Sequence, residues 1–378
     1  MKEDWKECKL GDVVEINQNS FSGKENWLFV NYLDTGSITE NKISEIQYIN
    51  LIDEKLPSRA KRKVKKNSII YSTVRPNQKH FGIIKSFPEN FLVSTGFAVL
   101  DVNKKIAFPD FVYYYLIQNE NTESLHAIAE QTTSAYPAIK PSDIADISII
   151  LPPLATQQKI AQILSSLDDK IELNNKINDN LEQQAQAIFK SWFVDFEPFG
   201  GKMPKGWKMG KLSDLITVKY GKDHKKLEDG SYPVYGSGGI MRYVDKFLYD
   251  KESVLIPRKG TLNNVFYINE PFWSVDTMFY TEMTKENLAK FVYFFVKGKD
   301  LNSMNAGSAV PSMTTEILNA IEVVIPSDEY LEKFENIVSP MFKQIKQCII
   351  ENENLASIRD TLLPKLMSGE IGVDEVKV

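Results

Sequence analysis

Two stretches of the chain carry apolar residues at alternating steps of four and three, the spacing that places them on one face of an α-helix. They run from Ile160 to Ile188 and from Phe334 to Leu362, at a constant offset of 174 residues. Each keeps this spacing over about four heptads, which favours a coiled coil because the apolar seam keeps facing one partner helix. The predicted seam comprises Ile160, Leu164, Leu167, Ile171, Asn178, Leu181, Ile188, Met341, Ile345, Cys348, Asn352, Leu355 and Leu362.

The pattern alone leaves the pairing and the limits of these helices open. Asn178 and Asn352 occupy equivalent seam positions, where an amide typically fixes the register of a coiled coil. Two amphipathic helices that each pack on a globular domain of their own would show a similar pattern. Ser339-Pro340 is typical of a helix start, so we expect the second long helix to begin there, after a short docking helix.

Outside the long helices the pattern changes to short apolar runs that are rich in β-branched residues and bounded by Gly, Pro and Asn, which is typical of strands. In the first half of the chain these runs are 69–71, 92–93, 97–100 and 147–151. In the second half they are 254–256, 265–268, 278–280 and 321–325. Periodicity does not decide whether the aromatic segments 111–117 and 291–296 are short helices or strands.

Landmarks outside the helices recur in one order, which indicates an internal repeat. The offset between the copies falls from 202 to 180 and then to 174 residues, so the second copy is shorter by about 28 residues. The landmarks are Trp5-Lys6, Leu10 and Asp12 with Trp207-Lys208, Leu212 and Asp214; Phe111 to Tyr113 with Phe291 to Tyr293; and Pro137 and Pro152 with Pro311 and Pro326.

These patterns predict an α+β protein with two β-rich domains in tandem, each followed by a long helix. The two helices are expected to pair as an antiparallel coiled coil with pseudo-twofold symmetry. The boundaries are expected at 1–155 for the first domain, 156–196 for the first long helix, 197–205 for a linker rich in Gly and Pro, 206–328 for the second domain, 329–368 for a docking turn and the second long helix, and 369–378 for a C-terminal tail.

Composition narrows the class of protein. The 378 residues are 25% charged and 43% hydrophobic, an ordinary soluble composition that allows two or three domains. The apolar runs are too short for a membrane span, and the segment from Met1 to Trp5 is too polar for a signal peptide. Cys8 and Cys348 are too few for a disulfide framework or a zinc site. We therefore expect a cytoplasmic protein with no membrane, metal or cofactor of its own.

Motifs of catalysis are not apparent in the sequence. Glycine spacing matches neither a phosphate-binding loop nor a dinucleotide-binding turn, and Gly236-Ser237-Gly238-Gly239 is better interpreted as a turn. The histidines His80, His126 and His224 lack the spacing of metal ligands. Asp168-Asp169-Lys170 is similar to an acidic-x-Lys nuclease element, but it lies within the first heptad helix and is expected to face solvent. The sequence does not indicate an enzyme.

Charge is distributed unevenly along a chain whose net charge is −5. The 34 residues from Lys55 to Pro88 contain ten Lys and Arg and no Asp or Glu. Such a segment can neutralise DNA phosphates, and arginines among Asn and Gln can also read base edges, although a solvated basic surface is an equal alternative. The candidate DNA-binding residues are Arg59, Lys61, Arg62, Lys63, Lys65, Lys66, Arg75, Lys79 and His80, with a weaker second group of Lys222, His224, Lys225, Lys226, Arg242, Arg258, Lys259 and Asn263.

Taken together, these features resemble the specificity (S) subunits of type I restriction-modification systems over essentially the whole chain. Each half opens with Trp-Lys and Leu-x-Asp and closes with a proline-bounded strand and a long helix. The segments that carry the resemblance are Leu151 to Ile160, Leu362 to Ile371, Ser72-Thr73-Val74-Arg75-Pro76 and Ile256-Pro257-Arg258-Lys259-Gly260. One departure is Asp328-Glu329-Tyr330, which replaces the Pro-Leu-x-x-Gln-Gln start of the second helix.

The resemblance implies a non-catalytic subunit in which two target-recognition domains each read one half of a split, asymmetric site in double-stranded DNA. It further implies that two methyltransferase (M) subunits dock on this scaffold for adenine methylation and that restriction (R) subunits add cleavage. The paired helices would act as a ruler, since about 29 residues of helix span about 43 Å and one turn of DNA is about 34–36 Å.

Two other functions remain open from the sequence. The chain could serve a related type II-like enzyme in which one partner subunit both modifies and cleaves DNA. It could also be a tandem adaptor that binds protein or carbohydrate, because aromatic β-rich domains joined by a coiled coil permit that.

Overall fold

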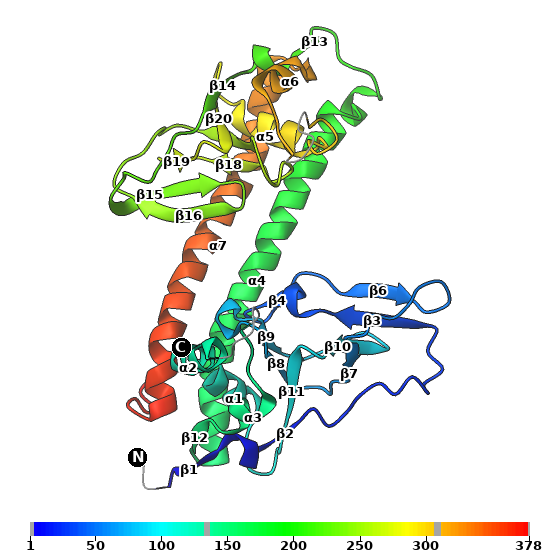
Figure 1. Cartoon of the computed structure of the whole chain (residues 1–378). Coiled ribbons are helices and arrows are strands. Elements are labelled where there is room, and N and C mark those ends of the chain that lie inside the picture. Colours follow the sequence, from blue (N-terminus) through cyan, green and yellow to red (C-terminus); the bar gives the residue numbers. More distant parts are fainter. Residues whose placement is uncertain (1–3, 132–136, 306–310, 377–378) are drawn as a thin grey trace. The chain divides into compact units, whose positions relative to one another are not determined.

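The computed structural model describes residues 4–131, 137–305 and 311–376. The predicted first domain includes Met1 to Glu3, and the predicted C-terminal tail includes residues 377–378; these five residues lie outside the described ranges. The chain divides into two compact units. Unit 1 comprises residues 1–173 and 351–378, and unit 2 comprises residues 174–350. Each unit therefore contains one half of each of two long helices, α4 (Leu154–Phe193) and α7 (Asp328–Ser368) (Figure 1).

Unit 1 contains two four-stranded sheets, a two-stranded sheet and a small hairpin. The first sheet has the order β2 (Val14–Ile16), β11 (Phe97–Val102), β8 (Ile69–Ser72) and β9 (Phe81–Ile83). The second has the order β6 (Gln47–Asn50), β3 (Phe29–Leu33), β10 (Phe91–Ser94) and β7 (Ala60–Arg62). Strand β1 (Lys6–Lys9) pairs with β12 (Ser148–Leu151), and β4 (Ile38–Thr39) pairs with β5 (Lys42–Ile43).

Unit 2 repeats this topology with fewer strands. The order β14 (Ile216–Tyr220), β20 (Met278–Met283), β17 (Ser253–Pro257) and β18 (Phe266–Ile268) matches that of the first sheet of unit 1. The order β16 (Gly239–Val244), β15 (Asp229–Gly236) and β19 (Trp273–Ser274) matches β6, β3 and β10, including the parallel pairing of the last two strands. Strand β13 (Lys208–Lys211) pairs with β21 (Glu322–Ile325) as β1 does with β12. The internal repeat expected from the sequence is thus present in the strand order.

Short helices complete both units. The two aromatic segments that periodicity left undecided are helices, α1 (Pro109–Leu116) and α5 (Ala289–Lys297). Helices α3 (Pro141–Ala145) and α6 (Thr315–Ala320) precede the last strand of each unit. Helix α2 (Asn119–Glu130), strand β7 and the β4–β5 hairpin have no counterpart in the described part of unit 2.

Each unit closes its core with one half of α4 and one half of α7. In unit 1, Leu164 of α4 and Leu366 of α7 are fully buried in one cluster with Phe111 of α1. In unit 2, the ring centroid of Phe189 in α4 lies 6.1 Å from that of Phe334 in α7 and 5.4 Å from that of Phe291 in α5. The predicted seam residues are all buried or half-buried. The helices are therefore part of both domain cores, and not only connectors.

Polar contacts in unit 1 show that α4 and α7 run antiparallel there. Asp168 of α4 binds Arg359 of α7 at 2.7 Å, and Lys170, further along α4, lies 3.7 Å from Glu351, which is earlier in α7. Asp168 also accepts a hydrogen bond of 2.6 Å from the hydroxyl of Tyr114. The expectation that Asp168 faces solvent is therefore wrong, because this carboxylate links α1, α4 and α7.

The start of α7 also differs from expectation. The helix begins at Asp328 and continues through Pro340, so Ser339-Pro340 is not its start and no separate docking helix precedes it. Phe334 and Val338 before the proline are fully buried, and Phe342 after it packs against the same core. Burial on both sides holds the helix together although Pro340 has no N–H for the carbonyl of Asn336.

Among the described residues, no helix combines the length and the apolar character that crossing a lipid bilayer requires.

Replacement of Pro340, an exposed residue inside α7, should stabilise the protein. Pro340→Ala restores one helical hydrogen bond and removes the steric conflict of the ring, so the free energy of unfolding should rise by about 1–3 kcal/mol. Urea unfolding of both proteins measures this. Pro204→Ala, in the linker outside the helices, is the matched control and should be neutral or slightly destabilising. A loss of stability in Pro340→Ala would show that the helix needs its proline.

Candidate nucleic-acid interface

The acid-free basic segment forms strands β7, β8 and β9 of unit 1, and four of its lysines are paired with acids from other segments. Lys65 lies 2.8 Å from Asp101 and Lys79 lies 3.0 Å from Glu40. Lys63 pairs with Glu25, and Lys85 pairs with Asp110. The carboxylates that pair with these lysines come from other parts of unit 1, outside the segment. These four lysines hold segments of the domain together and are poorly placed to neutralise DNA.

Lys63 is the clearest case of a structural cation. Its ammonium lies 5.2 Å from the ring centroid of Trp27, and Trp27 stacks on Phe21 at a centroid distance of 4.9 Å. The hydrogen bond from Lys63, with others from its own backbone and Ser22, lowers the pKa of Glu25 to about 2. Glu25 is therefore charged at neutral pH, and Lys63 is held between a carboxylate and two aromatic rings.

His80 and Arg62 are also engaged within unit 1. The His80 Nδ1 atom lies 2.6 Å from the carbonyl oxygen of Ile38 and 3.1 Å from the Thr39 hydroxyl. Arg62 is half-buried, and its backbone bridges to Ser20 beside the sheet. The Nε atom of Arg62 is buried, and no hydrogen-bond partner is found for it in the described part of the chain. Neither side chain is presented to solvent as an open cation.

Three exposed cations between Arg59 and Lys66 form no ion pair within the described ranges. These are Arg59 and Lys61, at or next to the edge strand β7, and Lys66, in the turn between β7 and β8. Ala60 between the first two is fully buried, so β7 turns its small residue inward and Lys61 outward. These three residues are called the β7 surface below. It is one part of the basic segment that is available to a polyanion.

Arg75 and Lys79 flank a single turn of 3₁₀ helix, Pro76–Gln78, at the end of β8. Both residues have left-handed backbone conformations, with φ of +47° and +54°. Arg75 is exposed, whereas Lys79 is half-buried and paired with Glu40. Arg75 and Lys79, both candidate DNA-binding residues from the sequence, thus differ in exposure.

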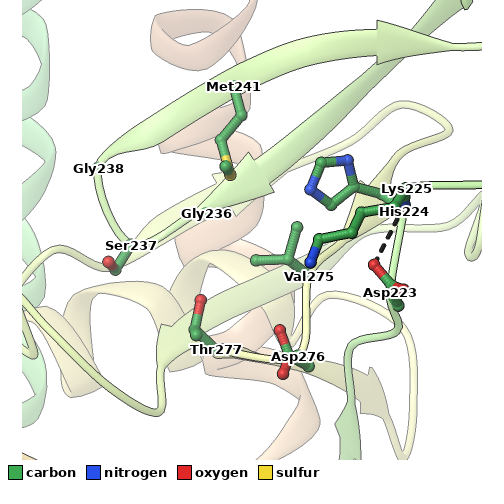
Figure 2. A pocket seen from close by; sticks show the side chains of 10 residues that line it. All are labelled: Asp223, His224, Lys225, Gly236, Ser237, Gly238, Met241, Val275, Asp276 and Thr277. Carbon is green, nitrogen blue, oxygen red and sulfur yellow. Dashed lines mark hydrogen bonds between the residues drawn. The ribbon is translucent and has the colours of Figure 1, made fainter.

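In unit 2, two of the candidate residues line a cavity of about 640 Å³ beside the β15–β16 hairpin (Figure 2). His224 and Lys225 line it from one side, and Gly236, Ser237 and Gly238 line the other. These three residues belong to the turn between β15 and β16, in agreement with the turn interpretation of this glycine-rich stretch. Asp276 and Thr277 also line the cavity. Its donors and acceptors are mixed, which suits a polar ligand better than a purely anionic one.

The other candidates of unit 2 do not form one basic surface. Arg242 binds Asp229 at 2.8 Å, and Arg258 donates to the carbonyl of Asp276 at 2.7 Å. The Arg258 guanidinium also lies 5.5 Å from the ring centroid of Tyr220. The side-chain amide of Asn263 lies 3.4 Å from Asp300. Lys222, Lys226 and Lys259 are exposed.

Comparison with known proteins assigns the chain to a family. The model of the type I restriction modification DNA specificity domain matches residues 2–183 and again residues 204–359. The chain belongs to this family. The two matches agree with the repeat seen in the strand order.

Curated relatives match along almost the whole chain. The type I restriction enzyme HindI specificity subunit of Haemophilus influenzae is 29% identical and aligns over 97% of this chain and 100% of its own length. The MjaIX specificity subunit of Methanocaldococcus jannaschii is 25% identical over 99% of this chain and 95% of its own. The solved S subunit from M. genitalium has a TM-score of 0.55 at 20% identity and covers 96% of both chains, which shows a shared fold.

These specificity subunits support the type I interpretation over the type II-like enzyme and the adaptor. A specificity subunit is the non-catalytic member of its system, so the chain is not expected to carry catalytic residues. The sequence did not identify Asp276, Thr277 and Met241 as cavity-lining residues. Met241 lies in β16, and Asp276 and Thr277 lie in the turn between β19 and β20. No sequence signal distinguishes them.

The structural role of Lys63 can be tested against its neighbour in the β7 surface. Lys63→Met removes the partner of Glu25, so the melting temperature should fall by a few degrees. Lys61→Met removes an equal charge at an exposed position and should leave the melting temperature nearly unchanged. Thermal unfolding of the two variants makes the comparison. Equal melting temperatures would contradict the assignment of Lys63 to the scaffold.

Proposed function

We propose that this specificity subunit binds double-stranded DNA and reads a bipartite, asymmetric site, one half with each unit. The observation that carries this proposal is a repeated strand order with different surface chemistry on the two copies. Unit 1 presents the cations of the β7 surface, whereas unit 2 presents a cavity with mixed polar groups. Two copies of the same fold with different surface residues suit two half-sites that differ in sequence.

The weak net charge is compatible with this function. With Lys63, Lys65, Lys79 and Lys85 paired inside unit 1, only part of the basic segment adds to attraction for phosphates. A few exposed cations give modest binding that depends on salt. The partner subunits would supply the rest of the affinity for DNA, so the chain alone should bind DNA weakly.

The partners we propose are two M subunits and, through them, R subunits, for adenine methylation or cleavage of DNA in the cytoplasm. Support comes from the relatives, which are named specificity subunits of type I restriction enzymes. An internal repeat offers two equivalent docking surfaces in one chain, as a twofold dimer would.

We further propose that α4 and α7 set the spacing between the half-sites. A helix of 40 residues, the length of α4, extends about 60 Å. Each helix contributes to the core of both units, so its length cannot change without displacing packed residues such as Phe189 or Leu164. A fixed helix length would therefore specify one spacing and exclude others.

The β7 surface should contribute to DNA affinity through charge. The triple variant Arg59→Ala, Lys61→Ala, Lys66→Ala, in complex with its M partner, should bind DNA more weakly at moderate salt. Each lost phosphate contact reduces the slope of log affinity against log salt by about 0.9, so the slope should fall by about 2–3. Fluorescence anisotropy across a salt series measures both quantities.

The matched control for that variant removes two exposed lysines elsewhere in unit 1, in Lys104→Ala, Lys105→Ala. It should keep the wild-type salt slope. If the triple variant keeps it as well, the β7 surface does not contact phosphates.

The spacing proposal predicts a change in the recognised DNA. Inserting four residues after Asn174 lengthens α4 by about 6 Å and shifts the heptad register. Methylation in cells should then be lost, or should move to sites with a different gap between the half-sites. Sequencing of methylated positions measures the gap. Methylation at the original spacing with full efficiency would show that the helices do not set it.

A further inference from the structure

The two units share a sharp turn of the backbone where β8 and β17 end. In unit 1 the N–H of Thr73 donates to Gly96 at 2.8 Å, and the carbonyl of Thr73 accepts from Ile139 at 2.8 Å. In unit 2 the N–H of Arg258 donates to Thr277 at 2.8 Å, and its carbonyl accepts from Met313 at 2.9 Å. Thr73 and Arg258 are therefore equivalent positions of the repeat.

Val74 and Lys259 extend this equivalence by one residue. Val74 bridges to Ala138, and Lys259 bridges to Ser312, each pair in antiparallel orientation. The next residue is Arg75 in unit 1 and Gly260 in unit 2. The same backbone position is thus filled by an arginine in one copy and by a glycine in the other.

At this position the backbone is left-handed in both units, with φ of +47° at Arg75 and +87° at Gly260. Glycine adopts such a conformation without steric cost, whereas a residue with a Cβ atom is strained there. Unit 2 therefore carries the residue that the backbone favours. Unit 1 carries an arginine there, whose Cβ atom makes the left-handed backbone strained. Backbone strain of this kind is concentrated at functional sites.

Unit 1 holds this strained turn firmly. The N–H of Arg75 donates to the carbonyl of Pro137 at 2.9 Å, and Pro76, the first residue of the 3₁₀ turn, is buried. Helix α2, which has no counterpart in the described part of unit 2, packs against this turn. The Arg75 side chain itself is exposed. A fixed backbone with an exposed guanidinium loses little freedom when a ligand binds.

Lys79 at the other end of the turn is not an equal candidate. Its φ is also positive, but its ammonium lies 3.0 Å from Glu40, and its carbonyl accepts from the N–H of Glu40 at 2.9 Å. This lysine joins the turn to the β4–β5 hairpin. Of the two residues that flank the turn, Arg75 has the more exposed side chain.

We propose that Arg75 is a DNA-contacting residue of the first half-site, held by the strained turn so that its guanidinium meets acceptor atoms of the DNA. The inference rests on the DNA-binding function proposed above. A guanidinium binds either phosphate oxygens or the O6 and N7 atoms of a guanine in a bidentate manner. Unit 2 has no arginine at this position, so the contact belongs to one half-site only.

The test uses three substitutions of Arg75 in the chain assembled with its M partner. Arg75→Gly removes the side chain and the strain, so its melting temperature should equal or exceed that of the wild type. Arg75→Ala removes the side chain and keeps the strain. Both should weaken DNA binding by about tenfold or more, which is the loss expected for a good arginine contact. Lys104→Ala, an exposed charge elsewhere in unit 1, should change binding less than about twofold.

Arg75→Lys distinguishes the two acceptors. Lysine retains the charge but lacks the planar fork, so a phosphate contact should largely survive and a guanine contact should not. Sequencing of methylated sites then gives an unchanged first half-site in the former case and a relaxed one in the latter. Either outcome supports the proposal.

Two outcomes would overturn it. One is an affinity within about twofold of the wild type for Arg75→Gly. The other is a loss of affinity that only follows a loss of folded protein in both variants, which would make Arg75 structural. If the wild-type complex binds no DNA, the proposed function itself fails. If the wild-type complex binds DNA and the Arg75→Gly complex binds it with equal affinity, the role of Arg75 is contradicted and the proposed function is not.

Discussion

The burial of α4 and α7 in both cores is the constraint on which the rest of the structure depends. Unit 1 is not closed by one contiguous segment, because Leu366 from near the C-terminus completes its core. Unit 2 is the contiguous segment 174–350, and Phe189 of α4 and Phe334 of α7 complete its core from the two ends of that segment. Removing either helix half would expose large apolar side chains around Phe111 or Phe291. The domains and the helices are thus stabilised by the same contacts.

Electrostatics in unit 1 divides one basic segment into two roles. Lysines whose ammonium groups lie within hydrogen-bonding distance of a carboxylate stabilise the domain, and their charge is largely cancelled at a distance. The exposed cations of the β7 surface form no ion pair within the described ranges, so they can attract a polyanion. This division explains how a chain of net charge −5 can present a basic surface, and why that surface is smaller than the number of basic residues in the segment indicates.

The architecture was largely predictable from the sequence, whereas the site was predictable only in part. Heptad spacing, β-branched runs and repeated landmarks depend on local patterns, and the two long helices and the equivalent strands follow from them. The course of α7 through Pro340 was not predictable, because tertiary burial of Phe334 and Val338 outweighs the local signal of the proline. The pairing of Lys63 with Glu25 joins residues that are 38 positions apart, which a charge count along the chain cannot detect. The left-handed backbone shared by Arg75 and Gly260 is likewise visible only once both copies are compared in three dimensions.

The central claim is that the two units read two different half-sites of one DNA sequence. Sequencing of methylated adenines in DNA from cells that express this chain with its M partner tests it most directly. The account predicts one asymmetric motif with two specified parts separated by a gap of constant length and unspecified sequence. A continuous motif, a palindromic motif or methylation without a motif would contradict it.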